Sequence, residues 1–404
     1  MLNLSGKSVG VEQRLFWSSV LLLFGEILAI RWLGIEVPTM KVFPNLVLLV
    51  VLVGASAGMS NPEKYTTPPK FLILSLCILM GTVIFSVLLG IPSLSIKVGE
   101  ASTAAVISAV VLLMALVLSL IALFVNVGGM MAAGFSALPP LRAYSINLLG
   151  SITGVVLVAL ISIFHLPPPV WILMCGLICW QSVRSKLVPI VTAVLIVAAC
   201  ATTLKSQWSP YSKLDVLPIE TAADSALGKG NYVLNSNNHY FHFALRMLND
   251  EEIERLSKEP ETPQKGIVEH YHDFLHIPFA CAPKHDRVLI LGGGSGNDVA
   301  YALAQGAKHV DVVEIDPIIS NLGKTIHPDK PYVDPRVTLH NEDARTFLRY
   351  SKDKFDLIEF SYLDPGSTVN SASFVRVDNF VYTVESIKSA ISRLDNGGLL
   401  TISF

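Results

Sequence analysis

The first half of this 404-residue chain is almost free of charged side chains. Residues 1–204 contain ten of the 30 basic residues and only five of the 32 acidic ones, so this half carries a net charge of +5 and the remainder −7. Charged residues make up 15% of the whole chain, against about 25% in ordinary soluble proteins. Because the deficit lies in one half, we expect a multi-pass α-helical membrane domain over 1–204, followed by a water-soluble domain.

Long apolar runs recur through the first half. A helix that crosses the bilayer core needs about 20 apolar residues, because it rises about 1.5 Å per residue. Two regions are irregular, the Gly-rich segment 127–140 and the Pro-containing segment 168–203, so we expect six to eight spans. The clear candidates are 15–34, 43–60, 71–90, 102–126 and 143–165.

The basic residues around these runs predict the orientation in the membrane. Loops rich in Lys and Arg face the cytoplasm. An even number of spans then places the soluble half in the cytoplasm as well. We therefore expect a multi-pass protein of the inner or plasma membrane, in contact with lipid, with a cytoplasmic soluble domain. Seven basic residues share one side if 170–180 crosses the membrane: Lys7, Arg14, Lys64, Lys70, Arg142, Arg184 and Lys186.

The second half alternates apolar strands with helices. After a polar linker over 205–229, we expect a small β-unit and a helix within 230–284, the helix over 270–283. From 285 to 404, five apolar strands alternate with helices, which is typical of a doubly wound α/β domain with a parallel sheet. In such sheets ligands bind at the carboxyl ends of the strands, where the strand order reverses.

Composition argues against two kinds of site. The acidic second half has no basic tract, so we expect no nucleic-acid binding. The five cysteines show neither a CxxC pattern nor a Cys/His spacing typical of zinc, and they form no even-numbered disulfide framework. We therefore expect no metal site and a reducing compartment.

A Gly-rich turn follows the first strand of the soluble domain. Glu314 closes the second strand, where a carboxylate can accept hydrogen bonds from both hydroxyls of a ribose. Asp343 closes the third strand and is placed to accept a hydrogen bond from an adenine amino group. Together these features predict a nucleoside site of the S-adenosylmethionine type; the alternative is that the two acids cap helices. The turn consists of Gly292, Gly293, Gly294, Ser295 and Gly296.

Several segments carry a resemblance to a known family. They are VLILGGGSGND, VDVVEIDP, DPRVTLHNEDARTFL and FDLIEFSYLDP, with YVLNSNN and EHYHDFLHIP upstream. All resemble the spermidine synthase (polyamine aminopropyltransferase) family, over about 230–404. In the first half, FGEILAIRWLG and AYSINLLGSITGV resemble the membrane-fused branch of that family.

The resemblance implies a membrane-bound transferase that moves an aminopropyl group from decarboxylated S-adenosylmethionine to a small amine. It implies that the Gly-rich turn and Glu314 hold the nucleoside of the donor and that Asp343 holds its adenine. Tyr271, His272 and Asp364 would then lie on the amine side of the pocket.

Two serines depart from the family pattern. Ser295 stands where the loop of the family has an acid, and Ser361 stands where the acid that deprotonates the amine is expected. A serine cannot take that proton at neutral pH unless another group activates it. Glu359 lies two residues earlier on the same face of the strand and is a substitute candidate for the catalytic base.

The loss of the acid at Ser295 keeps other functions open. That acid would repel the α-carboxylate of ordinary S-adenosylmethionine, so its absence favours binding of this donor or a loss of discrimination. One alternative is therefore an S-adenosylmethionine-dependent methyltransferase on the same scaffold. Another is a non-catalytic, nucleoside-binding membrane protein.

The last predicted strand, LLTISF, ends the sequence at Phe404, where members of the family continue with a helix and an antiparallel strand pair. Two explanations stay open. Either the sequence is truncated, or another polypeptide or a second copy in a homo-oligomer completes the sheet.

Overall fold

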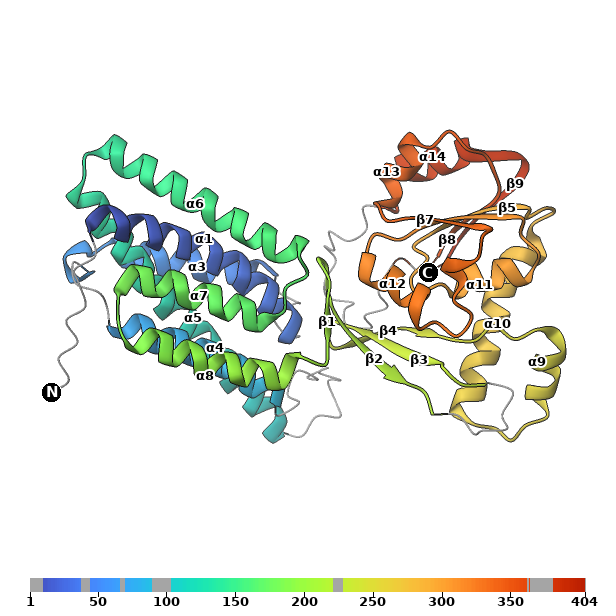
Figure 1. The fold of residues 1–404 in the computed structure, drawn as a ribbon, viewed down its shortest axis with the longest axis horizontal. Coiled ribbons are helices and arrows are strands. Elements are labelled where there is room, and N and C mark those ends of the chain that lie inside the picture. Colours follow the sequence, from blue (N-terminus) through green and yellow to red (C-terminus); the bar gives the residue numbers. More distant parts are fainter. Residues whose placement is uncertain are drawn as a thin grey trace. The chain divides into compact units, whose positions relative to one another are not determined.

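The computed structural model describes residues 10–37, 44–65, 70–88, 103–220, 228–361, 363 and 381–403. The chain divides into two compact units, Met1–Lys213 and Leu214–Phe404. Each unit has its own architecture, helical in the first and mixed α/β in the second (Figure 1).

The first unit is a bundle of apolar helices (Figure 1). Among its described residues, three stretches are long and apolar enough to cross a membrane: Val11–Glu36, Val110–Ala137 and Pro140–Ile163. The helices are α1 (Val11–Glu36), α3 (Pro44–Met59), α4 (Lys70–Leu88), α5 (Thr103–Ala137), α6 (Pro140–Ile163), α7 (Pro168–Val183) and α8 (Leu187–Thr203), with the 3₁₀ turn η1 (Pro62–Tyr65) after α3.

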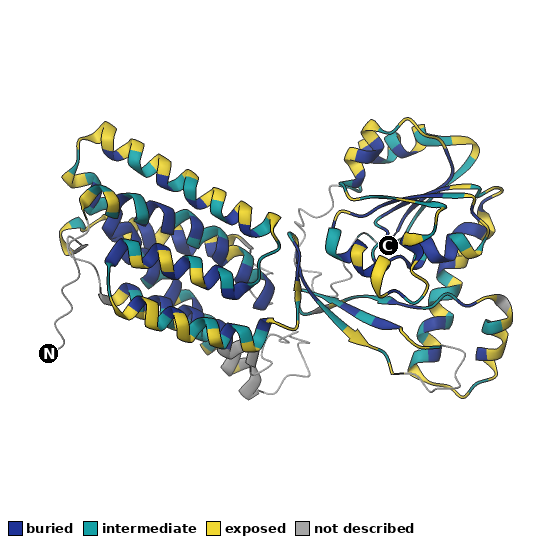
Figure 2. Ribbon diagram, in the orientation of Figure 1, coloured by how far each residue is buried: buried dark blue, intermediate teal, exposed yellow. Residues whose placement is uncertain are grey.

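Apolar side chains cover the outside of this bundle as well as its core. Phe24, Phe124 and Trp171 are buried inside, while the outward faces of α6 and α8 are largely exposed in Figure 2. The exposed side chains include Leu149 on α6 and Ile190 on α8. Helices that are apolar all round belong in a large core or in lipid, so this surface suits contact with hydrocarbon.

The Gly-rich segment 127–140, which we expected to be irregular, is helical as far as Ala137 and continues α5. Its glycines serve close packing between helices. A Cβ at Gly128 would overlap the carbonyl oxygen of Ala55 on α3, and a Cβ at Gly58 on α3 would overlap that of Val125 on α5. Small residues let helix backbones approach in this way.

Two charged side chains in the last part of α1 have partners within the first unit. Glu36 is fully buried, and Lys213 Nζ donates to both of its carboxylate oxygens at 3.2 Å. Arg31 donates to Ser162 Oγ at 2.5 Å and to Ser209 O at 2.7 Å. These contacts hold the segment after α8, which contains the short strand β1 (Gln207–Trp208), against α1.

The second unit begins with a small antiparallel sheet, as the sequence predicts. Its strands β2 (Lys213–Pro218), β3 (Tyr232–Ser236) and β4 (His239–Ala244) are neighbours in chain order. Asn237 and Asn238 both have positive φ between β3 and β4, which is the geometry of a tight hairpin turn. Strand β2 lies in the segment that we expected to be a linker, because it pairs with β3 and buries Leu214.

Two helices link the small sheet to the larger one. They are α9 (Asp250–Ser257) and α10 (Pro263–Cys281). Helix α10 starts seven residues before the predicted 270, because Thr262 caps its amino end by accepting a hydrogen bond from the Lys265 N–H. Pro263 occupies the first helical position, where proline is favoured.

The larger sheet is parallel and doubly wound, which confirms the predicted fold class. Its strand order is β7-β6-β5-β8-β9, so the order reverses between β5 and β8. The strands are β5 (Arg287–Leu291), β6 (His309–Val313), β7 (Val337–His340), β8 (Phe355–Phe360) and β9 (Leu394–Ile402). The connecting elements are α11 (Asn297–Ala304), α12 (Pro317–Thr325), η3 (Pro331–Val333), α13 (Ala344–Tyr350) and α14 (Val384–Arg393).

Helices cover both faces of this sheet. Helices α10 and α11 pack on one face, over Ile290, Val312 and Leu357. Helices α13 and α14 pack on the other, over Leu291 and Ile358. The alternation of side chains along each strand therefore decides which residues meet α11, the helix that follows the Gly-rich turn.

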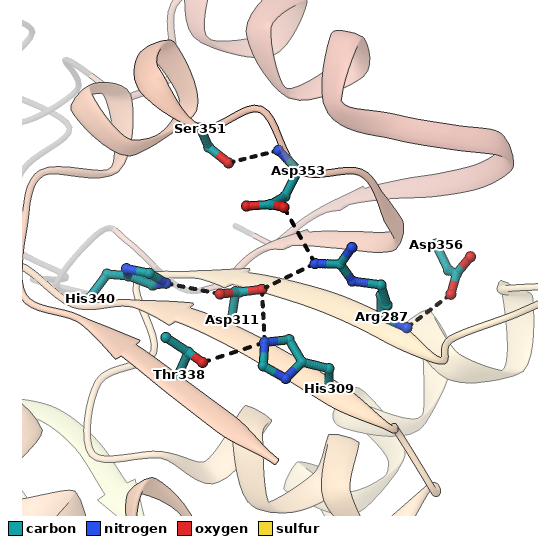
Figure 3. A network of polar contacts seen from close by, with 8 residues as sticks. All are labelled: Arg287, His309, Asp311, Thr338, His340, Ser351, Asp353 and Asp356. Atoms are coloured by element: carbon teal, nitrogen blue, oxygen red, sulfur yellow. Dashed lines mark hydrogen bonds and ion pairs between the residues drawn. The ribbon is translucent and has the colours of Figure 1, made fainter. Parts of the chain in front are cut away.

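A polar network lies on the face that carries α13 (Figure 3). Its centre is the buried carboxylate of Asp311, midway along β6, which lies 2.9 Å from Nε2 of His340 and 3.3 Å from Nε2 of His309. Arg287 lies 4.0 Å from the same carboxylate and 3.7 Å from that of Asp353. The network fixes β5, β6 and β7 to one another, and it reaches the carboxyl end of β7 at His340.

Candidate active site

The Gly-rich turn connects β5 to α11 at the point where the strand order reverses. The N–H groups of Gly292 and Gly293 both donate to the carbonyl oxygen of Val313, at 2.8 and 3.2 Å. The N–H of Gly296 donates to the carbonyl oxygen of Gly293 at 2.9 Å, and α11 begins at Asn297. The turn is thereby tied to the carboxyl end of β6, which carries Glu314.

Two of these glycines cannot be replaced without moving their neighbours. Gly292 has a φ of +83°, and a Cβ there would overlap the side chain of Leu363. Gly296 has a φ of +110°, and a Cβ there would lie 2.5 Å from Cγ of Pro331. Positive φ values strongly favour glycine, so the backbone conformation of the turn requires glycine at both positions.

Glu314 directs its carboxylate at the turn. Oε2 accepts a hydrogen bond from the Gly294 N–H at 2.8 Å, and Oε1 accepts one from the Asp316 N–H at 2.8 Å. Burial raises the pKa of Glu314 to about 7, while these two hydrogen bonds act to lower it. A carboxylate has about four lone-pair sites, so both oxygens keep capacity for ligand hydroxyls.

The middle of the turn is fastened to strand β4. Ser295 Oγ lies 2.6 Å from Nε2 of His242. Asn297 donates from Nδ2 to the carbonyl oxygen of Phe243 at 2.6 Å and accepts from the Leu245 N–H at 3.0 Å. Burial lowers the pKa of His242 to about 4, so this imidazole is neutral at physiological pH.

Asp343 caps the amino end of helix α13, as predicted by the alternative in which this acid is a helix cap. Its Oδ1 accepts hydrogen bonds from the N–H of Thr346 at 2.9 Å and from Oγ1 of Thr346 at 3.2 Å, at the start of α13. The side chain is half-buried. A role toward adenine stays a prediction.

Tyr271 and His272 lie on α10, where they meet different neighbours. The hydroxyl of Tyr271 lies 2.8 Å from that of Tyr240 on β4. The ring of His272 packs edge-on against Tyr301 of α11, with centroids 5.7 Å apart. Both residues thus adjoin elements that contact the turn, and their predicted role toward an amine stays a prediction.

The predicted catalytic residues lie in the last part of β8 or just after it. Ser361 donates its N–H to the carbonyl oxygen of Leu291 at 3.0 Å, which places it beside the start of the Gly-rich turn. Its hydroxyl donates to Oδ1 of Asp298 at 2.9 Å. Glu359 is 1% exposed on the same strand. Asp364 lies outside the described residues.

Sequence reasoning missed Asp298 and His242. Asp298 stands in the first turn of α11, two residues after the Gly-rich turn, and burial raises its pKa to about 6. The motif GGGSGND contains the signal, since an acid in the first turn of a helix beside a ligand loop is a candidate for function. The contact of His242 with the turn depends on tertiary structure and leaves no local signal.

Metal-binding side chains do not gather here. Within the part of the chain that the structure describes, no group of three or more His, Cys, Asp and Glu residues is placed to hold a metal ion.

Comparison with known proteins finds a family model that matches part of the second unit. Residues 269–403 match the spermine/spermidine synthase domain. A polyamine aminopropyltransferase of Alkaliphilus metalliredigens is 37% identical over 99 residues, which is 24% of this chain and 35% of the relative. Polyamine aminopropyltransferase 1 of Streptomyces coelicolor is 36% identical over 103 residues, 24% of this chain and 19% of the relative. The chain thus spans about a third or less of the length of these relatives.

Spermidine synthases are among the solved structures that match part of the chain. A spermidine synthase in complex with the transition-state analogue AdoDATO has a TM-score of 0.33 and 17% identity, over 49% of this chain and 54% of that one. The spermidine synthase of Thermotoga maritima has a TM-score of 0.34 and 18% identity, over 49% and 55%. The synthase-like domain, as we call residues 269–403, contains the Gly-rich turn, Glu314, Asp343, Glu359 and Ser361.

Proposed function

We propose that the chain is a membrane-bound aminopropyltransferase of the spermidine synthase type. It transfers an aminopropyl group from decarboxylated S-adenosylmethionine to a small amine. The observation that carries the proposal is the Gly-rich turn at the switch point, folded onto the buried carboxylate of Glu314, within a domain that matches this family. The apolar surface of the first unit and its three membrane-length stretches support attachment to the lipid bilayer.

In this reaction the neutral amine attacks the carbon next to the sulfonium. A nitrogen–carbon bond forms, the carbon–sulfur bond breaks, and its electron pair neutralises the sulfur, which leaves as a thioether nucleoside. The Gly-rich turn and Glu314 hold the ribose and Asp343 the adenine, with Tyr271, His272 and Asp364 on the amine side. Catalysis then depends mainly on holding the two substrates in line.

Calorimetric titration of the full chain in detergent tests this proposal. We expect decarboxylated S-adenosylmethionine to bind, and Glu314→Ala to weaken that binding at least tenfold. Glu385→Ala is the matched control, because Glu385 is an exposed carboxylate on α14 of the same domain. Failure of a folded wild-type protein to bind the nucleoside would overturn the proposal and favour a function of the membrane unit.

One observation favours a methyltransferase as the second candidate. Ser295 stands where the family has an acid, and its hydroxyl lies 2.6 Å from the neutral imidazole of His242. Neither group repels the α-carboxylate of ordinary S-adenosylmethionine. The released nucleoside distinguishes the two reactions. Methylthioadenosine means aminopropyl transfer, and S-adenosylhomocysteine means methyl transfer.

A further inference from the structure

Glu359 is a buried carboxylate without a hydrogen-bond partner in the described part of the chain. Its side chain is 1% exposed, and neither Oε1 nor Oε2 has a hydrogen-bond partner among the described residues. Across the ladder, Glu359 is in register with Thr401 of β9, whose buried Oγ1 also has no partner there. Buried polar groups are normally hydrogen-bonded, so such exceptions call for an explanation, and a bound ligand is one.

A second carboxylate lies on the same side of the sheet. Leu357, Glu359 and Ser361 alternate with Ile358 and Phe360 along the chain, so the first three face the layer of α11. Asp298, in the first turn of α11, accepts the hydroxyl hydrogen bond of Ser361 at 2.9 Å. Burial raises the pKa of Glu359 well above its usual range, and the neighbouring charge of Asp298 raises it further.

The position of this pair is that of a binding site rather than of a folding core. Ser361 is hydrogen-bonded to Leu291, the last residue of β5. Asp298 follows the Gly-rich turn by two residues. The two carboxylates therefore lie beside the switch point of the sheet, where ligands of this architecture bind. A cationic ligand that donates several hydrogen bonds suits a pair of buried acids.

We propose that Asp298 and Glu359 form the subsite for the ammonium group of the acceptor amine and receive its proton. This inference rests on the proposed transferase function. The acceptor enters as an ammonium ion, and one N–H proton passes to the ionised member of the pair. The neutral nitrogen then forms the bond to the aminopropyl carbon as the carbon–sulfur bond breaks. The product leaves as a secondary ammonium, and the proton on the pair returns to water.

The pair also accounts for the two serines in the site. Neither Ser295 nor Ser361 can accept the proton of an ammonium ion at neutral pH. Asp298 supplies a carboxylate from α11 instead, at hydrogen-bond distance from Ser361, and Glu359 supplies the second from β8.

The first test needs no catalysis. Glu359→Gln should raise the thermal unfolding temperature of the ligand-free full chain in detergent at neutral pH. A glutamate that is charged in the unfolded chain must be protonated before it is buried at this site, and glutamine does not carry this cost. The matched control is Asp356→Asn, on the same strand. Asp356 is also buried, but it accepts hydrogen bonds from Lys284 Nζ at 3.0 Å and from the Arg287 N–H at 2.9 Å. We expect Asp356→Asn to lower the unfolding temperature.

The second test measures the ligand. Butane-1,4-diamine should bind the wild-type chain in the presence of methylthioadenosine, and the affinity should fall at least tenfold in Asp298→Asn and Glu359→Gln. Both variants should bind methylthioadenosine as the wild type does. Unchanged diamine affinity in the double variant, with the nucleoside bound, would overturn the subsite and leave the transferase proposal standing. Loss of nucleoside binding in the wild type itself would instead overturn the proposed function.

Discussion

Glu314 balances two opposing effects at a single side chain. Burial favours its protonated form, and the N–H groups of Gly294 and Asp316 favour the carboxylate. The outcome is a pKa of about 7, so the charge of this residue changes near neutrality. A ribose that donates two more hydrogen bonds would favour the charged form and lower this pKa.

We predict that Glu314 makes the ligand-free protein less stable as pH rises. Its pKa is higher in the folded chain than in the unfolded one, so its contribution to stability is complete below about pH 4.5 and is lost as pH rises through about 7. Between about pH 5 and pH 8, the stability of the wild type relative to Glu314→Gln should fall by about 2.5 kcal/mol. Unfolding of both proteins across this range measures the difference.

The comparison with Glu314→Gln isolates this residue from the buried histidines. Burial lowers the pKa of His242 to about 4 and that of His327 to about 3, so both destabilise the fold as pH falls below about 6.5. They do so equally in the two proteins. Parallel stability curves for the wild type and Glu314→Gln would refute the prediction.

Asp311 should prove structural. Replacing it with Asn removes the carboxylate that is hydrogen-bonded to His340 and lies 3.3 Å from Nε2 of His309, at the centre of the network in Figure 3. We expect Asp311→Asn to lower the unfolding free energy by about 1–3 kcal/mol while leaving nucleoside affinity unchanged. Asp353→Asn, at an exposed carboxylate of the same network, should change stability by less than about 0.5 kcal/mol. A loss of nucleoside affinity in Asp311→Asn would contradict this assignment.

Individual site residues differ in how far the sequence predicts them. The Gly-rich turn and Glu314 sit at strand ends, and strand ends can be read from apolar runs. The contact of Asp298 with Ser361 could not be read from apolar runs, because Ser361 is 63 residues further along the chain. Their contact depends on β5 and β8 being neighbours in the sheet. That order is a property of the topology, which no local pattern encodes.

Among the elements, helix boundaries depended on packing partners more than on composition. Segment 127–140 contains glycines that disfavour an isolated helix, yet α5 continues through it because Gly128 packs against Ala55 of α3. The segment of strand β2 was predicted as a linker because its pairing partner is not local in sequence. Strand β3 begins 14 residues after β2 ends. The doubly wound sheet was predictable because its buried strands are continuous apolar runs.

Contact between α3 and α5 gives a prediction with an internal control. Gly58→Ala would drive a methyl group into the backbone of α5 at Val125, whereas Gly81→Ala on α4 meets nothing within 4 Å. We expect Gly58→Ala to destabilise the bundle by about 1–3 kcal/mol. Gly81→Ala should stabilise it by about 0.5–1 kcal/mol, because alanine loses less conformational entropy in a helix. Thermal unfolding in detergent compares them, and equal unfolding temperatures would contradict the close packing of α3 and α5.

At the scale of the whole molecule, the uneven distribution of charge predicts two environments. The first unit carries its apolar side chains on the outside as well as the inside, and the second carries most of the acids. This division was visible in the sequence, because lipid and water select opposite compositions. The number of spans was less predictable, since helices α7 and α8 are short and adjacent.

Cysteine labelling should report the orientation of the chain in a bacterial membrane. Cys281 is exposed at the end of α10, whereas Cys175 and Cys179 are buried. If the second unit is cytoplasmic, a membrane-permeant maleimide labels Cys281 in intact cells and a charged, impermeant one does not. Cys281→Ser identifies the signal.

The same experiment needs a site on the opposite side of the membrane. Ser95→Cys, made in the Cys281→Ser background, lies between the predicted spans 71–90 and 102–126, and the impermeant reagent should label it. Three predicted spans precede Ser95, so labelling there would place the amino terminus in the cytoplasm, as the basic residues at that end predict. Labelling of Cys281 by the impermeant reagent in intact cells would mean an odd number. It would place the candidate active site outside the compartment in which S-adenosylmethionine-type donors are made, and the transferase proposal would then fail with it.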